Sequence, residues 1–178
     1  MTYIMQYFNN LGIGELQLGK SLEQINPLNQ FGPSDRDNLI PGPDGDAWFK
    51  YMGEITGLSD GKSLSFPAES IYLAVNPVKK VNRIWIYPKT EVIGVSIENL
   101  LSNVYGNPMI SSGGMAEIGG TTSYTNYFYV SKDKVIQVAY HKVFDVESIG
   151  PEHISFRFIN DDDAFKYNLT YRTWKKYM

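Results

Sequence analysis

The sequence predicts an α+β fold, in which a mainly antiparallel sheet carries helices packed on one face. Two observations predict it. The segment Gly19–Ile25 recurs 75 positions later as Gly94–Leu100, with the same order of Gly, Ser, apolar, acidic, amide and apolar residues. After each copy come runs rich in β-branched and aromatic residues, bounded by Gly, Pro, Asn and Asp. We therefore expect a single domain, residues 1–178, built as a duplicated helix-plus-three-strand unit with repeats at about 12–88 and 92–178.

A helix is expected to start in each copy, because Ser21 and Ser96 stand where an N-cap residue is needed. Ser21 and Gln24 also have the spacing of a capping box. Pro27 shortens the first helix, since proline disfavours helical geometry in the preceding residue. The second helix is better formed, with an apolar stripe at helical period: Ile97, Leu100, Leu101, Val104 and Tyr105.

Three strands are expected after each helix. They are residues 47–52, 71–75 and 81–87 in the first repeat, and 123–130, 135–140 and 154–159 in the second. Periodicity does not decide whether residues 3–8 form a strand or a helix. The tail 165–173 alternates apolar and polar residues, which favours a final strand. Residues 32–46 are expected to form a long loop, and residues 111–120 a glycine-rich connection.

Composition limits the kinds of function. The chain has 178 residues, 43% of them hydrophobic, which is enough for a substantial core. It contains no Cys, so disulfides, thiolate metal sites and a catalytic thiol are excluded. The net charge of −3 argues against nucleic acid and anionic membranes as partners and favours a basic partner. With no long apolar run and no basic, apolar leader at the N-terminus, a cytoplasmic protein is expected.

Residues 14–21, Gly-Glu-Leu-Gln-Leu-Gly-Lys-Ser, match the phosphate-loop pattern G-x-x-x-x-G-K-S. In such a loop, backbone amides at a helix N-terminus cradle phosphates, with Lys20 and Ser21 in the lysine and magnesium-binding positions. The surroundings favour another interpretation, because polar and apolar residues alternate inside the pattern and Pro27 follows early. The duplicated copy has Val95 in place of the lysine. We interpret the segment as a helix start and keep nucleotide binding as an alternative.

No catalytic constellation is recognisable. There are only two histidines, His141 and His153, so a His-rich metal site is excluded by count. A general base at His141 would need a nucleophile that the sequence does not identify, and no G-x-S-x-G motif occurs. We expect a protein that is not an enzyme and that uses no cofactor or metal. A pair of carboxylates drawn from separate loops stays open as a route to catalysis.

Two acidic segments are candidate partner-binding surfaces. One lies in the long loop, and its spacing does not fit a twelve-residue calcium loop. The other is a run of three aspartates, for which a solvated turn is the competing interpretation. Complementary charge would attract a basic protein to both. The residues concerned are Asp35, Asp37, Asp44, Asp46, Asp161, Asp162 and Asp163.

Aromatic residues make up 14% of the chain, and several fall on two neighbouring predicted strands. Period two places Tyr127 and Tyr129 on one face, with Phe128 and Val130 on the other. Two interpretations stay open: cross-strand packing in the core, or a tyrosine-rich recognition surface that gives large contact area at low entropic cost. Under the second, Tyr124, Tyr127 and Tyr129 are partner-binding residues.

The repeated plan of a Gly-x-Ser-capped helix, an aromatic-Gly-(x)-Pro stop and three antiparallel strands resembles the tandem unit of β-lactamase-inhibitor-like proteins. That resemblance covers most of residues 12–159 and implies a periplasmic or envelope binding module. The chain also resembles bacterial toxin-immunity proteins in its small size, acidity, lack of Cys and tyrosine-rich sheet. This second resemblance implies binding and inhibition of a cognate basic toxin, possibly a nuclease. We take the immunity protein as the expected function, with the inhibitor-like module and an enzyme as alternatives.

Overall fold

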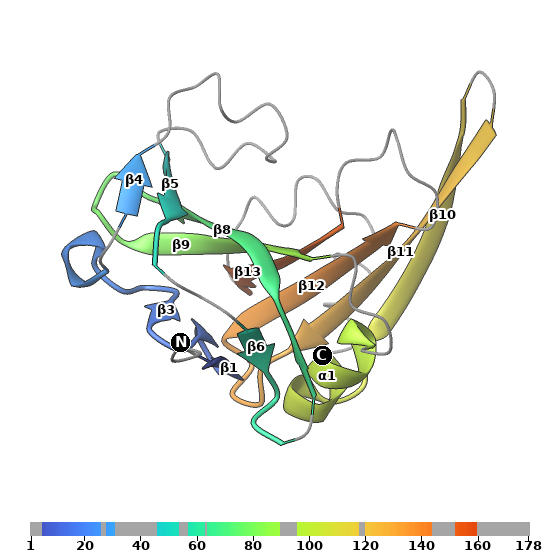
Figure 1. Ribbon diagram of the computed structural model, residues 1–178, viewed down its shortest axis with the longest axis horizontal. Helices are drawn as coiled ribbons and strands as arrows, with labels where there is room; N and C mark the ends of the chain where they lie inside the picture. The colour runs from blue at the N-terminus through green and yellow to red at the C-terminus, as the bar shows by residue number, and fades with distance from the viewer. Residues whose placement is uncertain are drawn as a thin grey trace.

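The computed structural model describes residues 5–25, 28–30, 46–53, 57–62, 64–89, 96–117, 120–143 and 152–159. Within them the chain is mostly β, with two sheets, one α-helix and one 3-10 turn (Figure 1). The large sheet has the order β10-β11-β12-β13-β9-β8-β5-β4. Its strands are β4 (Leu28–Gln30), β5 (Ala47–Tyr51), β8 (Ala68–Val75), β9 (Val81–Pro88), β10 (Met109–Glu117), β11 (Gly120–Val130), β12 (Ile136–Val143) and β13 (His153–Phe158).

The small sheet has the order β3-β2-β1-β6-β7. Its strands are β1 (Met5–Asn9), β2 (Gly12–Ile13), β3 (Leu16–Gln17), β6 (Gly57–Ser59) and β7 (Ser65–Phe66). All strand pairs in both sheets are antiparallel except β1 with β6, which is parallel. The helix is α1 (Ile97–Tyr105), and the 3-10 turn is η1 (Leu22–Gln24).

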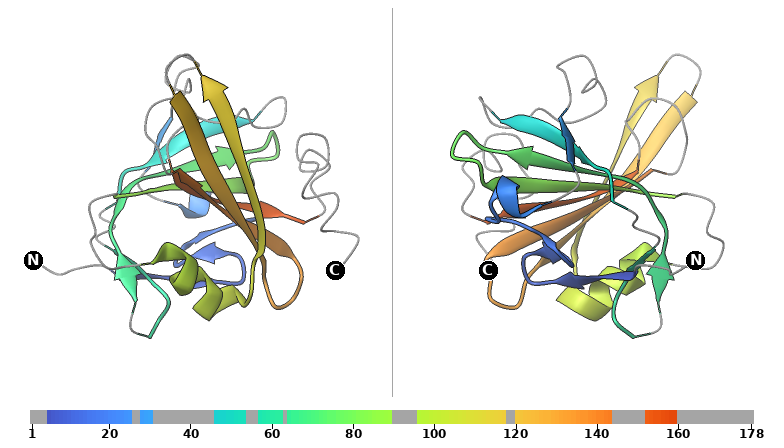
Figure 2. Two further views of the ribbon diagram at one scale, coloured as in Figure 1. Left: turned by 90° about the vertical axis from the view of Figure 1, so that its right-hand side faces the viewer. Right: turned by 60° about the vertical axis from the view of Figure 1, so that its left-hand side comes forward.

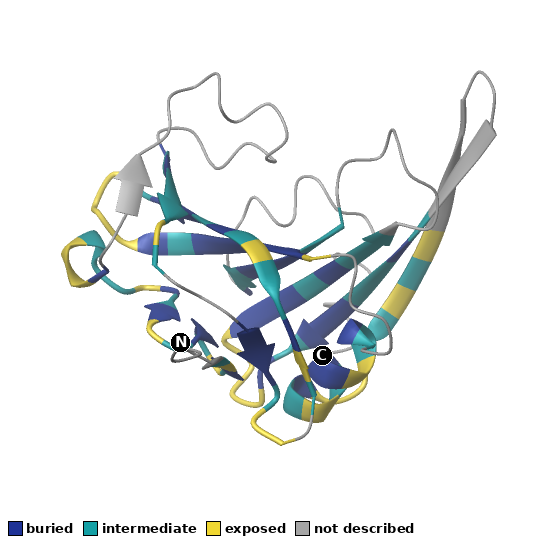
Figure 3. Cartoon of the chain, in the orientation of Figure 1, coloured by how far each residue is buried: buried dark blue, intermediate teal, exposed yellow. Residues whose placement is uncertain are grey.

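The main core lies between one face of the large sheet and a layer formed by α1 and the small sheet (Figure 1). We call this the inner face of the large sheet. Its residues alternate along each strand, as period two requires. The helix contributes Leu100 and Leu101, both fully buried, and the small sheet contributes Ile13 and Leu58. Figure 3 shows the buried stretches along the large sheet and exposed residues in the turns.

Two hydrogen bonds from buried tyrosines fix α1 against both sheets. The Tyr105 hydroxyl donates to the Asn9 carbonyl of β1 at 2.8 Å, and the Tyr129 hydroxyl of β11 donates to the Glu98 carbonyl at 3.1 Å. The helix begins at Ser96, whose hydroxyl accepts from the Asn99 amide. The N-cap and the apolar stripe predicted for this helix are therefore confirmed, apart from Val104, which is only partly buried.

All six predicted strands are confirmed, as β5, β8, β9, β11, β12 and β13, and residues 5–9 form a strand, β1. The predicted tail strand at 165–173 and most of the 32–46 loop lie outside the described residues. The expectation of a connection at 111–120 is wrong, because most of it belongs to β10 and β11.

The expectation of helices in the plural is also wrong within the described residues. After Ser21 the chain makes only the single 3-10 turn η1, and Ile25 already has extended geometry at φ −114°. The Gln24 side chain accepts from the Ser21 amide at 3.0 Å, so the capping-box partner predicted from spacing is present. A local cap alone does not stabilise a longer helix, because helical stability comes mainly from packing of an apolar face.

Candidate functional site

The predicted partner-binding residues divide into two groups. Six aspartates, Asp35, Asp37, Asp44, Asp161, Asp162 and Asp163, lie outside the described residues. Asp46 is described and buried, with 8% of its surface exposed, and its carboxylate accepts from the Asn82 side chain at 2.8 Å. The expectation that Asp46 binds a partner at the surface is therefore wrong, because its carboxylate is buried and accepts an internal hydrogen bond.

The three predicted tyrosines do not share one surface. Tyr129 is fully buried in the main core, and Tyr127 packs against that core with its ring 5.8 Å from Tyr140. Burial raises the pKa of the Tyr129 hydroxyl to about 12, which keeps it a neutral donor to α1. The prediction that Tyr127 and Tyr129 lie on the same face of the sheet is confirmed. The interpretation that Tyr129 is exposed for a partner is wrong. Tyr124 is half-buried on the opposite face, beside His141.

A candidate interaction surface is the outer edge of β10, the strand at one end of the large sheet. β10 pairs with β11 at nine successive positions without a bulge, and no described strand pairs with its other edge. Residues 109–117 contain no Lys, Arg or Pro. Ile110 is 57% exposed on this strand. The β10–β11 hairpin projects from the body of the molecule (Figure 2). We call this feature the β10 edge.

An edge of this kind is a template for another strand. No described strand pairs with its outward N–H and C=O groups, and natural proteins usually protect such rows with lysine, proline, bulges or short strands. The other end of the sheet follows that rule, since β4 is only three residues long. The β10 edge has nine residues and none of these four devices.

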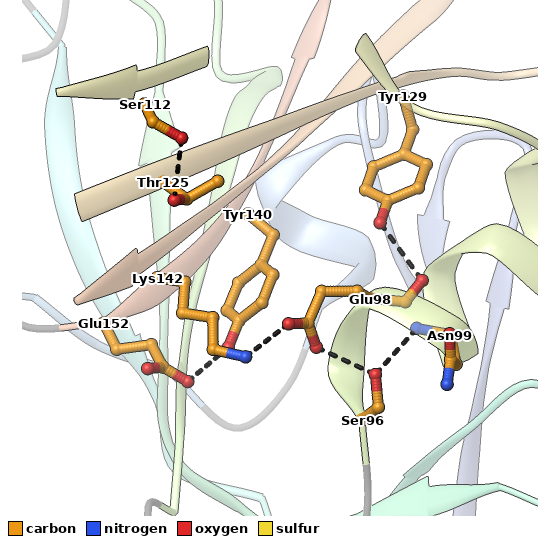
Figure 4. Close-up of polar contacts among 9 residues, drawn as sticks. All are labelled: Ser96, Glu98, Asn99, Ser112, Thr125, Tyr129, Tyr140, Lys142 and Glu152. Carbon is orange, nitrogen blue, oxygen red and sulfur yellow. Dashed lines mark hydrogen bonds and ion pairs between the residues drawn. The ribbon is translucent and has the colours of Figure 1, made fainter. Parts of the chain in front are cut away.

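A polar network lies where β12 meets the start of α1 (Figure 4). The Lys142 ammonium forms an ion pair and a short hydrogen bond with the Glu98 carboxylate, which also accepts from the Ser96 hydroxyl at 2.9 Å. The Tyr140 hydroxyl donates to Glu152 at 2.5 Å. These contacts connect the first turn of α1 to β12 and to the residue preceding β13.

The network shifts the pKa values of both ion-pair partners. Burial alone would raise the pKa of the Glu98 carboxyl, but hydrogen bonds from Lys142 and Ser96 and the Lys142 charge outweigh it and hold the pKa below its ordinary value. Burial alone would lower the pKa of Lys142, but the Glu98 carboxylate outweighs it and raises that pKa. Both groups are therefore charged at neutral pH, and this pair is a structural brace between α1 and β12.

Glu98→Gln is expected to lower the free energy of unfolding at pH 7 by about 1–3 kcal/mol, because a hydrogen bond between charged groups is lost. A lowered pKa in the folded state gives stability that is present above the ordinary value of 4.5 and is lost as the pH falls through the folded pKa. The difference in free energy of unfolding between the wild type and the variant should therefore shrink below about pH 4.5. Urea denaturation between pH 3 and pH 7 measures it.

The matched control is Glu15→Gln. Glu15 pairs with Lys20 at 2.9 Å, but its side chain is 85% exposed, so solvent screens the pair and no measurable change is expected. Equal losses in the two variants, or a Glu98→Gln difference that is constant with pH, would contradict the brace assignment.

The opposite face of the large sheet carries a row of aromatic rings and both histidines. Successive ring contacts run from Tyr124 to His141 (5.5 Å), to His153 (5.1 Å) and to Trp85 (4.3 Å). Trp85 continues the row to Trp48 and to Tyr87, and these three rings form a second buried cluster with Ala74. Nothing in the sequence pattern marked this row, because its members come from five separate strands.

The segment that matches the phosphate-loop pattern does not form a phosphate cradle. Its backbone amides donate within the protein: Gly14 to Tyr7, Leu18 to Leu11, Gly19 to Val81 and Lys20 to Gln17. The Lys20 ammonium binds both the carbonyl and the carboxylate of Glu15. Residues 12–17 form the β2–β3 hairpin instead, so the amides that would hold phosphate are already used.

Comparisons with protein-family models, curated proteins and solved structures find no match to this chain. Among the described residues, no helix has the length and apolar character needed to cross a membrane. Within the same part of the chain, no group of three or more His, Cys, Asp and Glu residues is placed to hold a metal ion. Among the described residues, the β10 edge offers a surface for a protein partner.

Proposed function

We propose that this chain is a protein-binding protein that takes an extended strand of a partner onto the β10 edge and thereby neutralises the partner, as an immunity protein does to its cognate toxin. The observation that carries the proposal is the β10 edge, nine residues long, without a bulge, with Ile110 exposed. Strand addition gives affinity through main-chain hydrogen bonds, and side chains at alternate positions give specificity.

The brace at Glu98 and Lys142 supports this function indirectly, because it joins α1 to β12, the strand that pairs with β11 of the hairpin. Ordering a loop or a strand on binding costs free energy that a prearranged surface does not lose. The Ser112 and Thr125 hydroxyls, hydrogen-bonded at 3.0 Å across β10 and β11, add a further contact within the hairpin. The acidic loops predicted from sequence would then act on the association rate with a basic partner.

We also infer that the two halves are repeats. In the large sheet, β4, β5, β8 and β9 form one antiparallel block, β10 to β13 form a second, and the blocks meet through β9 and β13. Each block follows a helical turn, η1 or α1. This arrangement supports the duplication and the resemblance to β-lactamase-inhibitor-like proteins, with β6 and β7 as an insertion in the first repeat.

The test is binding to the purified product of the adjacent gene, measured by isothermal titration calorimetry together with assay of that product's toxicity. Ile110→Lys is expected to weaken binding by at least about tenfold, which is about 1.4 kcal/mol, because a charge on the edge opposes strand addition. Val78→Lys is the matched control: Val78 is 73% exposed in the β8–β9 turn, and the net charge changes equally.

The outcomes separate the parts of the proposal. A partner that loses its toxicity when bound, with Ile110→Lys impaired and Val78→Lys unimpaired, supports both the function and the site. Binding that is equally strong in both variants removes the β10 edge as the interface. A partner that is bound but keeps full toxicity overturns the neutralising function.

A further inference from the structure

The β10 edge also suits a second copy of this chain. β10 pairs with β11 over Met109–Glu117 without a bulge, and no described strand pairs with its outer edge. An unprotected edge is a template for any strand that meets it, and an identical edge is present wherever the protein itself is present. We propose that two copies of the chain pair through their β10 edges, and that this weak dimer covers the edge until a partner strand displaces the second copy. The inference rests on the same edge as the proposed function and concerns the protein before it meets its partner.

The shape of the hairpin allows this pairing. A closed dimer of identical edges is isologous, so its two copies of β10 run antiparallel. With the two-fold axis at Gly113, the middle of the strand, position 109 of one copy faces position 117 of the other. The β10–β11 hairpin projects from the body of the molecule (Figure 2). Antiparallel pairing therefore places the two bodies toward opposite ends of the paired hairpins, which keeps them apart.

Charge favours the antiparallel arrangement. Residues 109–116 contain no charged residue, and Glu117 is the only one in β10. In the antiparallel dimer the two Glu117 positions are about 27 Å apart along the strands, at about 3.4 Å per residue. That separation is well beyond the screening length of about 8 Å at physiological salt. A parallel pairing in register would instead bring the two glutamates together.

The pairing gains main-chain hydrogen bonds and covers apolar surface, but over a small area. Ile110 is 57% exposed, so a strand added beside it removes apolar surface from water. The edge is about 30 Å long and about 10 Å thick, which gives about 300 Å² per copy. A standard interface buries about 800 Å² per partner. The dimer is therefore weak and transient, and a partner strand with better side-chain contacts can replace the second copy.

Sedimentation velocity of the full chain alone, from low micromolar to submillimolar concentration, tests the proposal. A monomer–dimer equilibrium is expected. Ile110→Lys should raise the dimer dissociation constant by at least about tenfold, because each dimer then carries a lysine on both edges. Val78→Lys is the matched control and should leave the constant unchanged, since Val78 is 73% exposed in the β8–β9 turn and the added charge is the same.

A single cysteine locates the interface, because the chain has none of its own. Facing Cα atoms of antiparallel strands are about 4.5–5.5 Å apart, a separation that a disulfide spans. Gly113→Cys faces its own copy across the two-fold axis, so mild oxidation should give a crosslinked dimer. Val78→Cys at the same concentration should give little. Circular dichroism establishes that each variant is folded.

The outcomes separate self-pairing from partner binding. A wild type that stays monomeric over the whole range overturns self-pairing, as does a dimer that Ile110→Lys leaves unchanged or a folded Gly113→Cys that crosslinks no more than Val78→Cys. These results are obtained without the partner, so they leave the proposed function to its own calorimetric test. A partner that dissociates the dimer on binding supports both proposals. A partner that binds the intact dimer supports self-pairing and removes the β10 edge as the partner's interface.

Discussion

Tyr129→Ala is expected to lower the free energy of unfolding by about 3–5 kcal/mol, the range found when a buried aromatic side chain is truncated. Tyr129 is fully buried in the main core, and it is one of the largest such side chains. Its ring lies 6.4 Å from that of Tyr105, so truncation opens a space where β11 meets α1. Guanidinium denaturation followed by circular dichroism measures the loss.

The matched variant is Tyr129→Phe, which keeps the ring and removes only the hydroxyl. That hydroxyl donates to the Glu98 carbonyl at 3.1 Å, and its loss should cost about 0.5–1.5 kcal/mol. The pair of variants separates packing from hydrogen bonding. A Tyr129→Ala protein that keeps wild-type stability would show that the side chain is not part of the core, and would restore its candidacy as a partner anchor.

Gly12→Ala is expected to cost about 3–5 kcal/mol, because strain in a rare backbone conformation is combined with a steric clash. Gly12 in β2 has φ +154°, and a Cβ there would lie 2.3 Å from the Leu16 carbonyl oxygen and 2.8 Å from the Ile84 side chain. The carbonyl is backbone and belongs to the paired strand β3, so it cannot move without breaking the hairpin. Thermal and urea denaturation measure the loss.

Gly106→Ala is the control for conformational strain alone. Gly106 follows α1 with φ +89°, but nothing lies within 4 Å of the position of a Cβ. The expected cost is about 1–2 kcal/mol, from a backbone conformation that glycine adopts far more readily than alanine. A Gly12→Ala loss no larger than that of Gly106→Ala would show that the β2–β3 hairpin can move aside, and that it contributes little rigidity to the small sheet.

Local sequence patterns were sufficient to predict a helix or strand when all the residues that determine it lie in one short segment. The cap at Ser96 and the apolar stripe that follows predicted α1, since both depend on residues within one helix. Runs of β-branched and aromatic residues predicted six strands, and period two placed Tyr127 and Tyr129 on the same face. These features follow from helical and extended geometry, which each residue and its near neighbours determine.

The wrong expectations for the site residues Tyr129 and Asp46 have a different cause. The same alternation that assigned Tyr129 to a face does not say which face is covered, and α1 covers it. Asp46 stands next to a turn-rich loop and looks exposed by composition, but Asn82, 36 residues away, binds its carboxylate. Burial of a side chain depends on which distant segments pack on it, and a local pattern carries no such information.

By itself, the sequence determined the one long helix, the six predicted strands and the predominance of antiparallel pairing, because these depend on periodicity and on short connections. Only the tertiary structure decided the edge from which function is argued. β10 is rich in glycine and serine and becomes a strand through pairing with β11. His141 and His153 likewise become neighbours only through the register of β12 with β13. Strand pairing and register join residues that are distant in sequence, so edges and cross-strand contacts arise only when the sheet is assembled.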